Sequence, residues 1–302
     1  MKDKGSRNLA GAMTALVTPF DGKGRVDVPA LEALARWQVE RGIDGLVPCG
    51  TTGEGATLDA GEKAEVVAAV VRATGGRIPV VAGVGSNVTR TTLDAARDAA
   101  EAGADALLVV TPYYNKPNRS GMIAHYEAVA AETGLPVVVY NVPSRTGQNL
   151  GADLILRLAR IPGVVAVKEA SGDLDQIAAV LEGRPEGFAV LSGDDPLAMP
   201  TVALGADGVI SVVSNQAPAE MAQMIAAARD GRLEDARQIH YRLLPLMRAN
   251  FIETNPVPVK TAMHLLGHCG GGLRPPLGPP SERTVERMRE VLVKAGIGGV
   301  AS

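Results

Sequence analysis

One repeated pattern limits the fold of this chain more than any other feature: a helix-like segment ends at a glycine and an apolar run follows. The pattern occurs at RGIDGLV (41–47), AGADALLVV (102–110) and LGADGVISV (204–212), and a related form, an apolar run after proline, at IPVVA (78–82) and LPVVVY (135–140). Glycine tolerates the left-handed conformation that ends helices, and runs of small and β-branched residues are typical of buried parallel strands. The sequence therefore predicts alternating helices and parallel strands.

Eight strand-like runs are spaced evenly along the first three quarters of the sequence, at 12–17, 46–49, 80–83, 107–110, 137–140, 164–168, 189–192 and 209–212. The segments between and after them have the apolar period of amphipathic helices, at 29–40, 60–72, 91–101, 121–132, 152–160, 174–181, 196–204 and 221–229. An eightfold alternation of this kind predicts an α/β fold of the (β/α)8 TIM barrel type.

The remainder of the sequence carries no strand signal. After Gly231 the periodicity indicates helices at 233–251, 257–266 and 281–295. We therefore predict a catalytic barrel domain over residues 1–231 and a small C-terminal all-helical domain over residues 232–302. The Gly- and Pro-rich link at 270–280 is expected to be an ordered surface loop.

The composition of the chain argues against nucleic acid and membrane as its binding partners. The chain has 30 Lys and Arg against 33 Asp and Glu, so it offers no basic surface for nucleic acid. Its apolar runs fall far short of the roughly 18 residues of a membrane span. With only two cysteines, Cys49 and Cys269, and a charged segment Met1–Asn8 that lacks an apolar core, the chain is expected in the cytoplasm. A small molecule is the expected partner.

The predicted strand 164–168 ends unusually, because its apolar run is followed directly by Lys168. An amine at the mouth of a buried strand loses water, and this favours its neutral, nucleophilic form. Lys168 is therefore a candidate for Schiff-base chemistry. For a lone lysine the alternative is a side chain that reaches the surface and pairs with a carboxylate.

Polar residues at the other strand ends favour the catalytic interpretation, since catalytic groups of these barrels lie where strands end. The sequences there are CGTTGE (49–54), TPYYNKP (111–117), YNVPSRTG (140–147), SGDD (192–195) and IS (210–211). Together they offer hydroxyls, phenols and an arginine around the lysine. Imine chemistry needs such groups to hold a carboxylate and to carry protons.

Six ordered motifs make the chain similar to the dihydrodipicolinate synthase family, within the pyruvate-dependent N-acetylneuraminate lyase superfamily. They are GTTGE (50–54), TPYYNKP (111–117), YNVPSRTG (140–147), VKEASGD (167–173), LSGDD (191–195) and NPVPVK (255–260). The resemblance implies that Lys168 forms an imine with pyruvate, whose enamine attacks L-aspartate 4-semialdehyde. The product would be 4-hydroxy-tetrahydrodipicolinate, the entry to diaminopimelate and lysine.

The same resemblance implies roles for the residues of the pyruvate site. Tyr140 would be the general acid and base over the imine, and Thr51 and Tyr114 would relay its protons, because a phenol alone is a poor base at neutral pH. Thr51 and Thr52 would hold the pyruvate carboxylate. Without the motifs, a Thr pair is more simply a helix-capping turn and a Tyr pair a packing or interface element.

For the second substrate, the resemblance implies that Arg145 binds the carboxylate of the semialdehyde through a bidentate pair. Gly193 and Ile210 would shape the pocket through backbone contacts, and Glu54 and Glu169 are interpreted as structural partners. No cofactor and no metal ion is expected. A metal site at His264, His268 and Cys269 is disfavoured, because no further ligand accompanies them in the sequence.

Two alternatives remain open from the sequence. The chain could be another class I lyase of the superfamily, cleaving N-acetylneuraminate or a 2-keto-3-deoxy sugar acid, although Arg145 suits a short dicarboxylate-like adduct better. It could also be a catalytically silent barrel with a binding role.

The resemblance also implies an assembly and a regulatory property. The assembly would be a homotetramer of tight dimers, in which Tyr114 completes the relay of a neighbouring chain. Feedback inhibition by L-lysine is expected to be weak or absent, because Gly55, Lys63 and Thr91 stand where inhibited members commonly have serine, histidine and glutamate. Lys63 would repel an ammonium group and Thr91 would remove a charge-assisted bond.

Overall fold

The computed structural model describes residues 9–298; the charged segment 1–8 and residues 299–302 lie outside the described part. Eight parallel strands form a single sheet in the order β2-β1-β8-β7-β6-β5-β4-β3. A parallel bridge between Leu46 and Val80 joins its two ends. The strands are β1 (Gly11–Ala15), β2 (Gly45–Val47), β3 (Val81–Gly83), β4 (Ala106–Val110), β5 (Val137–Asn141), β6 (Val164–Glu169), β7 (Ala189–Ser192) and β8 (Gly208–Ser211).

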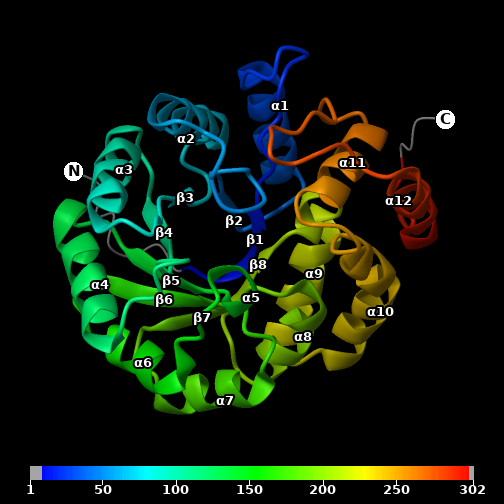
Figure 1. Ribbon diagram of the computed structural model, residues 1–302. Helices are drawn as coiled ribbons and strands as arrows, with labels where there is room; N and C mark the ends of the chain where they lie inside the picture. The colour runs from blue at the N-terminus through cyan, green and yellow to red at the C-terminus, as the bar shows by residue number, and fades with distance from the viewer. Residues whose placement is uncertain (1–8, 299–302) are drawn as a thin grey trace.

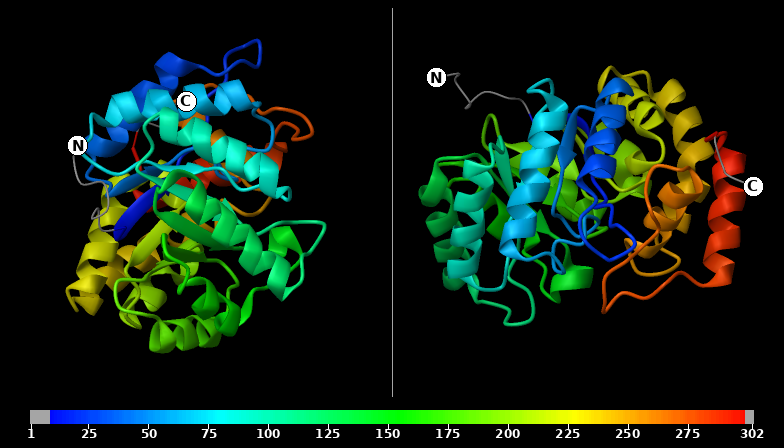
Figure 2. Two further views of the ribbon diagram at one scale, coloured as in Figure 1. Left: turned by 90° about the vertical axis from the view of Figure 1, so that its left-hand side faces the viewer. Right: turned by 90° about the horizontal axis from the view of Figure 1, so that it is seen from above.

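Helices surround this sheet on all sides, as Figure 1 shows along the barrel axis and Figure 2 from two further directions. They are α1 (Val28–Glu40), α2 (Ala60–Thr74), α3 (Thr89–Glu101), α4 (Arg119–Thr133), α6 (Gly151–Leu158), α7 (Leu174–Gly183), α8 (Asp195–Ala203) and α9 (Pro218–Arg229). The predicted (β/α)8 barrel is therefore confirmed, and each predicted strand and helix has a counterpart within a few residues.

The repeated Gly-x-Asp pattern has a structural role in three places. Its glycines adopt positive φ, for example 106° at Gly205, as expected where a helix turns into a strand. Its aspartates each accept a hydrogen bond from the backbone N–H of the preceding strand region: Asp44 from Ala12 (2.7 Å), Asp105 from Val80 (3.0 Å) and Asp207 from Val190 (2.8 Å). The repeat therefore aligns neighbouring strands as well as ending helices.

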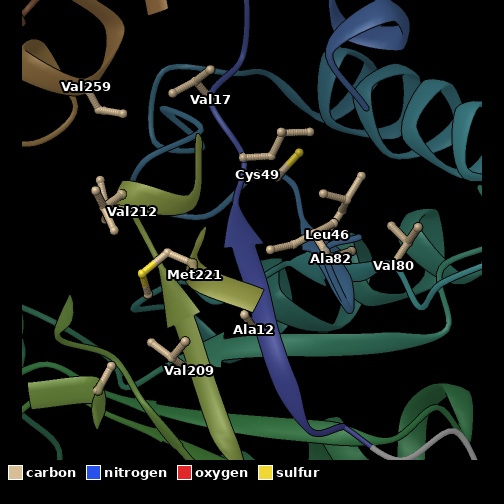
Figure 3. Close-up of a cluster of buried hydrophobic side chains, with 14 of the residues drawn as sticks. Ala12, Val17, Leu46, Cys49, Val80, Ala82, Val209, Val212, Met221 and Val259 are labelled. Atoms are coloured by element: carbon tan, nitrogen blue, oxygen red, sulfur yellow. The ribbon is translucent and has the colours of Figure 1, made fainter. Parts of the chain in front are cut away.

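The barrel has two layers of buried side chains because successive strand residues point to opposite faces. The inner layer fills the barrel with residues such as Met13, Val138, Ala166 and Leu191. The outer layer lies between the strands and the helices, and Figure 3 shows part of it. It includes Val259, which belongs to the C-terminal helices, so the apolar core is continuous from the barrel to the end of the described chain.

Three C-terminal helices complete the molecule: α10 (Leu233–Ala249), α11 (Val257–Leu265) and α12 (Glu282–Ala295). Helix α10 packs against α8, α9 and α12, and α11 contacts α12 and the short 3-10 helix η2 (Val213–Asn215). These positions match the predicted helices 233–251, 257–266 and 281–295. The boundary between residues 231 and 232 stays a prediction.

Two short helices were not predicted from the sequence. One is η2, which follows β8, and the other is α5 (Pro143–Thr146), which follows β5. Pro143 begins α5 and Gly147, at φ 74°, ends it. Four residues are too few for an amphipathic period, yet this turn carries Arg145.

Candidate active site

A cavity of about 770 Å³ opens where the strands end. Its wall combines strand ends, the turns that follow them and a segment between α10 and α11. The lining residues are Ala15, Val47, Gly50, Thr51, Thr52, Leu108, Tyr140, Val142, Ser144, Arg145, Lys168, Ala170, Gly193, Asp194, Pro196, Val212, Arg248, Phe251, Ile252, Glu253, Thr254 and Asn255. The predicted strand ends therefore meet at one cavity.

Lys168 and Tyr140 are direct neighbours at this cavity. They are paired in register on β6 and β5, and Lys168 Nζ lies 4.3 Å from the centre of the Tyr140 ring. The lysine is only 5% exposed and forms no ion pair with any described residue. A buried amine without a carboxylate partner, against a phenol that can carry a proton, is suited to imine formation.

The next residue along the strand, Glu169, faces the other way. Its Oε2 accepts hydrogen bonds from Asn141 Nδ2 (2.9 Å) and Gln176 Nε2 (3.3 Å), and its Oε1 accepts one from the Ser171 backbone N–H (2.7 Å). The carboxylate is thus fully engaged between β5, β6 and α7. It stabilises the strand end that carries Lys168 and does not reach the cavity-lining groups.

Gly193 leaves room for the lysine. A Cβ at this position would lie 2.7 Å from the Cβ of Ala170 and 3.1 Å from Cε of Lys168. Contacts of this length require a neighbour to move. A residue with a Cβ at this position would therefore displace Ala170 or the Lys168 side chain.

The turn after β2 brings Thr51 and Thr52 to the opposite wall. Its backbone reaches positive φ at Cys49 (58°) and Glu54 (53°), a conformation that is uncommon for residues other than glycine. Thr52 is 2% exposed, and its Oγ1 accepts a hydrogen bond from Asn255 Nδ2 at 3.0 Å. Two adjacent hydroxyls with nearby backbone N–H groups can hold a carboxylate.

Arg145 lies on α5 at the mouth of the cavity. Its Nη2 donates to the Asn255 backbone carbonyl at 3.4 Å, and it forms no ion pair with the residues that the structure describes. The guanidinium is exposed. It is therefore free to bind a carboxylate that enters from solvent.

Comparison with known proteins identifies this arrangement. Residues 8–295 match the dihydrodipicolinate synthetase family. The chain belongs to this family. The 4-hydroxy-tetrahydrodipicolinate synthase of Nitratidesulfovibrio vulgaris strain DP4 is 51% identical over 290 residues, which cover 96% of this chain and 99% of the relative.

Solved structures of the dihydrodipicolinate synthetase family agree with the fold. The Aquifex aeolicus dihydrodipicolinate synthase superposes with a TM-score of 0.94 at 43% identity, covering 97% of this chain and 100% of that chain. A chloride-inhibited dihydrodipicolinate synthase from Acinetobacter baumannii, complexed with pyruvate, gives a TM-score of 0.94 at 41% identity, covering 96% of this chain and 100% of that chain. The family predicted from the six motifs is confirmed.

Two of the residues predicted for the site do not line the cavity. Tyr114 is 89% exposed, at φ 70°, in the loop after β4. Ile210 is 1% exposed and belongs to the inner layer of the barrel, in the same apolar cluster as Tyr140. The other six predicted residues do line it: Lys168, Tyr140, Thr51, Thr52, Arg145 and Gly193.

Several lining residues were missed by the sequence reasoning. Asp194 follows Gly193, and burial raises the pKa of its carboxyl group. Arg248 and the segment 251–255 come from the region after the barrel and close one side of the cavity. Asn255 is the first residue of the NPVPVK motif, which marked this segment in the sequence, and it contacts Thr52.

Other nucleophiles and candidate ligands near the site have structural explanations. Burial raises the pKa of the Cys49 thiol to about 12, so this cysteine stays protonated. His268 stacks on Trp37 at 4.2 Å, and His264 Nδ1 lies 3.3 Å from the Cys269 carbonyl. Within residues 9–298 no group of three His, Cys, Asp or Glu side chains is placed to hold a metal ion.

Proposed function

We propose that this chain condenses pyruvate with L-aspartate 4-semialdehyde to give 4-hydroxy-tetrahydrodipicolinate, in the diaminopimelate and lysine pathway. One observation supports the proposal: Lys168 is buried with no ion-pair partner among residues 9–298, at a cavity lined by the Thr51 and Thr52 hydroxyls and by the Arg145 guanidinium. The name of the Nitratidesulfovibrio relative supports the same reaction. So does the pyruvate in the Acinetobacter structure.

Lys168 acts as the nucleophile. Its neutral amine attacks the pyruvate C2 carbonyl, water leaves, and an imine forms. Loss of a C3 proton gives the enamine, whose C3 attacks the aldehyde carbon of the second substrate and forms the new C–C bond. The amino group of that substrate then displaces Lys168 Nζ from C2, which closes the ring and frees the enzyme. The protonated imine is itself the electron sink, so the reaction needs no cofactor.

The residues around Lys168 transfer protons and bind the pyruvate carboxylate. Tyr140 transfers protons at the imine, with Thr51 as its relay partner. Thr51 and Thr52 hold the pyruvate carboxylate, while Gly193 leaves space for the adduct. Ile210 shapes the pocket through its backbone.

The second substrate enters on the side of Arg145, which pairs with its carboxylate. This pairing distinguishes the proposed reaction from the sugar-acid lyase alternative. A lyase for N-acetylneuraminate or a 2-keto-3-deoxy sugar acid would have to accommodate a polyhydroxylated chain next to this guanidinium. A catalytically silent barrel would have no use for a buried lysine that lacks an ion-pair partner among the described residues.

The assembly proposed for the chain is a homotetramer built from tight dimers, in which Tyr114 of one subunit completes the proton relay of another. The exposure of Tyr114 and of its neighbour Tyr113, at 89% and 38%, supports an interface there. We place the enzyme in the cytoplasm, where its buried cysteines would stay reduced. No helix among residues 9–298 is both long and apolar enough to cross a membrane.

Regulation by L-lysine is proposed to be weak. Lys63 and Thr91 lie on α2 and α3, and neither supplies the carboxylate that an ammonium ligand needs. This remains a prediction.

Pyruvate trapping tests the proposed function directly. Incubation with pyruvate and borohydride should fix one pyruvate-derived mass per chain at Lys168, and Lys168→Ala should abolish it. Lys168→Arg should abolish it as well, because a guanidinium stays protonated and cannot form the imine. Mass spectrometry of peptides locates the adduct.

The exposed Lys116 and the buried Lys260 provide controls. Lys116→Ala should leave trapping unchanged, and no adduct should map to Lys260. Trapping that survives in Lys168→Ala would disprove the role of this residue. The enzyme that forms the adduct is then given either aspartate semialdehyde with pyruvate, or sialic acid. The substrate that is turned over decides between the two lyase activities.

A further inference from the structure

The NPVPVK motif, residues 255–260, is joined at both of its ends to the GTTGE turn, residues 50–54. At one end, Asn255 Nδ2 donates to Thr52 Oγ1 at 3.0 Å. At the other, Lys260 Nζ donates to Glu54 Oε1 at 2.6 Å, with both side chains fully buried. More than 200 residues of chain separate each pair, so the region after the barrel holds a turn of the barrel in place.

The direction of the hydrogen bond between Asn255 and Thr52 determines whether the Thr52 hydroxyl can donate its proton to a ligand. A hydroxyl has one proton to donate and lone pairs that accept. Because Thr52 Oγ1 accepts from Asn255, its own proton is free to point elsewhere, and Thr52 lines the cavity. The bond from the Asn255 amide therefore leaves the proton of the Thr52 hydroxyl available to an anion in the cavity.

The same residue also contacts the second anion site, since its backbone carbonyl accepts from Arg145 Nη2 at 3.4 Å. Two residues earlier, Glu253 joins the same segment to the start of α12. Its carboxylate accepts hydrogen bonds from the Ser281 backbone N–H (3.0 Å) and Oγ (2.6 Å). Asn255 is 6% exposed. It is thus a buried residue that contacts both Thr52 and Arg145.

We propose that Asn255 is a positioning residue for the pyruvate half-site, acting through the Thr52 hydroxyl. The proposal rests on the proposed function, because it takes the anion at Thr52 to be the carboxylate of pyruvate. It assigns a role in orienting the substrate to the region after the barrel, which also lines one side of the cavity.

A double-mutant cycle with Thr52→Val and Asn255→Leu tests the proposal. Both changes keep side-chain size and remove polarity. Thr52→Val should raise the pyruvate concentration for half-maximal borohydride trapping about 10- to 100-fold, since a hydrogen bond to a charged group is lost. Asn255→Leu should raise it about 3- to 10-fold, because Thr52 keeps its hydroxyl but loses its orientation.

The pyruvate dependence of trapping in the double variant decides the question. If Asn255 acts through Thr52, Asn255→Leu should add less than about twofold in the Thr52→Val background, whereas independent effects would multiply. Its melting temperature should stay close to that of the parent, since both partners of the bond have been replaced by apolar groups. In Asn255→Leu the KM for the semialdehyde should change little, because the backbone carbonyl that contacts Arg145 remains.

Asn250→Leu is the matched control. Asn250 is a buried asparagine at the end of α10 that exchanges two hydrogen bonds with Gln216, at 2.8 and 3.0 Å, outside the cavity. This variant should lower the melting temperature without changing the pyruvate dependence of trapping. The control separates a loss of stability from a loss of positioning.

The possible failures are distinguishable. If the parent forms no adduct with pyruvate, the proposed function is wrong, and the proposed role of Asn255 in pyruvate binding is wrong as well. If the parent is trapped normally but Asn255→Leu leaves the pyruvate dependence unchanged, or if its effect multiplies that of Thr52→Val, only the positioning role is overturned.

Discussion

Lys168 and Lys260, two buried lysines of the described part of the chain, show how the surroundings of an ammonium group determine its role. Lys260 is paired with Glu54 and lies over the Phe20 ring at 4.1 Å; burial lowers the pKa of its amine while the Glu54 carboxylate opposes that change. Lys168 is buried to a similar degree but has no carboxylate partner among the described residues. The first is a structural ion pair, and the second keeps an amine available for chemistry.

The close packing around Gly193 predicts the effect of adding one methyl group at this position. Gly193→Ala should lower kcat/KM at least about tenfold, because the new Cβ forces Ala170 or the Lys168 side chain to move, and overpacking of this kind costs about 1–3 kcal/mol. Steady-state kinetics with both substrates measures the loss. Gly272→Ala is the control, since a Cβ there meets nothing within 4 Å. Equal activity in the two variants would refute the packing argument.

At the scale of elements, the sequence predicts what depends on local signals. Strand β7 (Ala189–Ser192) has its predicted bounds, because an apolar run ended by polar residues is a local pattern. Helix α5 lies below the length at which periodicity is visible. The contact of Asn255 with Thr52 spans 203 residues, so no local pattern indicates it. The barrel and six of the eight predicted cavity residues were thus accessible from the sequence, whereas the wall formed by 251–255 required the tertiary structure.

The contact between α3 and α4 gives a prediction for pH dependence. His125, on α4, is buried, and its Nδ1 lies 3.0 Å from Oγ1 of Thr89 on α3. Burial lowers the pKa of this imidazole from 6.5 to about 4. Between these two values the unfolded chain binds more protons than the folded chain, so the free energy of unfolding falls as the pH drops from 6.5 towards 4.

Replacing this histidine should flatten that dependence. The contribution of His125 amounts to about 3 kcal/mol between pH 7 and pH 4, and His125→Asn removes it while keeping a partner for Thr89. Urea unfolding at several pH values measures the effect. His264→Asn, the same substitution at an exposed histidine, serves as the control. A parental slope in His125→Asn would show that other groups cause the acid sensitivity.

At the scale of the whole molecule, the C-terminal helices and the barrel act as one structure. Arg274, from the loop between α11 and α12, donates its backbone N–H to Glu54 Oε2 at 3.0 Å and pairs with Glu62 at 2.5 Å. Together with Lys260 it places two cations over the Phe20 ring. The predicted surface loop 270–280 is thus tied to the barrel through its arginine, next to the turn that carries Thr51 and Thr52.

The buried pair in this connection yields a stability prediction. Lys260→Met should lower the free energy of unfolding by about 3–5 kcal/mol, because it leaves the Glu54 carboxylate buried without its cation. The double variant Glu54→Gln/Lys260→Met should recover much of this loss, since it removes both charges. Urea denaturation measures all three proteins. Lys294→Met, at an exposed position, should be near neutral. A double variant that is less stable than Lys260→Met would contradict the charge argument.

Tyr114 connects the single chain to its assembly. The residue holds a left-handed backbone conformation, at φ 70°, which costs free energy for a residue with a side chain, and yet its ring is 89% exposed. Neither feature benefits the isolated subunit. Both are explained if the phenol enters the site of a neighbouring subunit, as the proposed dimer requires.

Mixed oligomers test this arrangement. Tyr114→Phe should reduce kcat, and Lys168→Ala should abolish activity. When the two variants are co-expressed, a mixed dimer combines Lys168 of one subunit with Tyr114 of the other, which rebuilds one complete site out of two. Specific activity of the purified mixture should therefore exceed the average of the two parents. If Tyr114 served its own chain, each mixed dimer would contain only defective sites, and the mixture would show no gain.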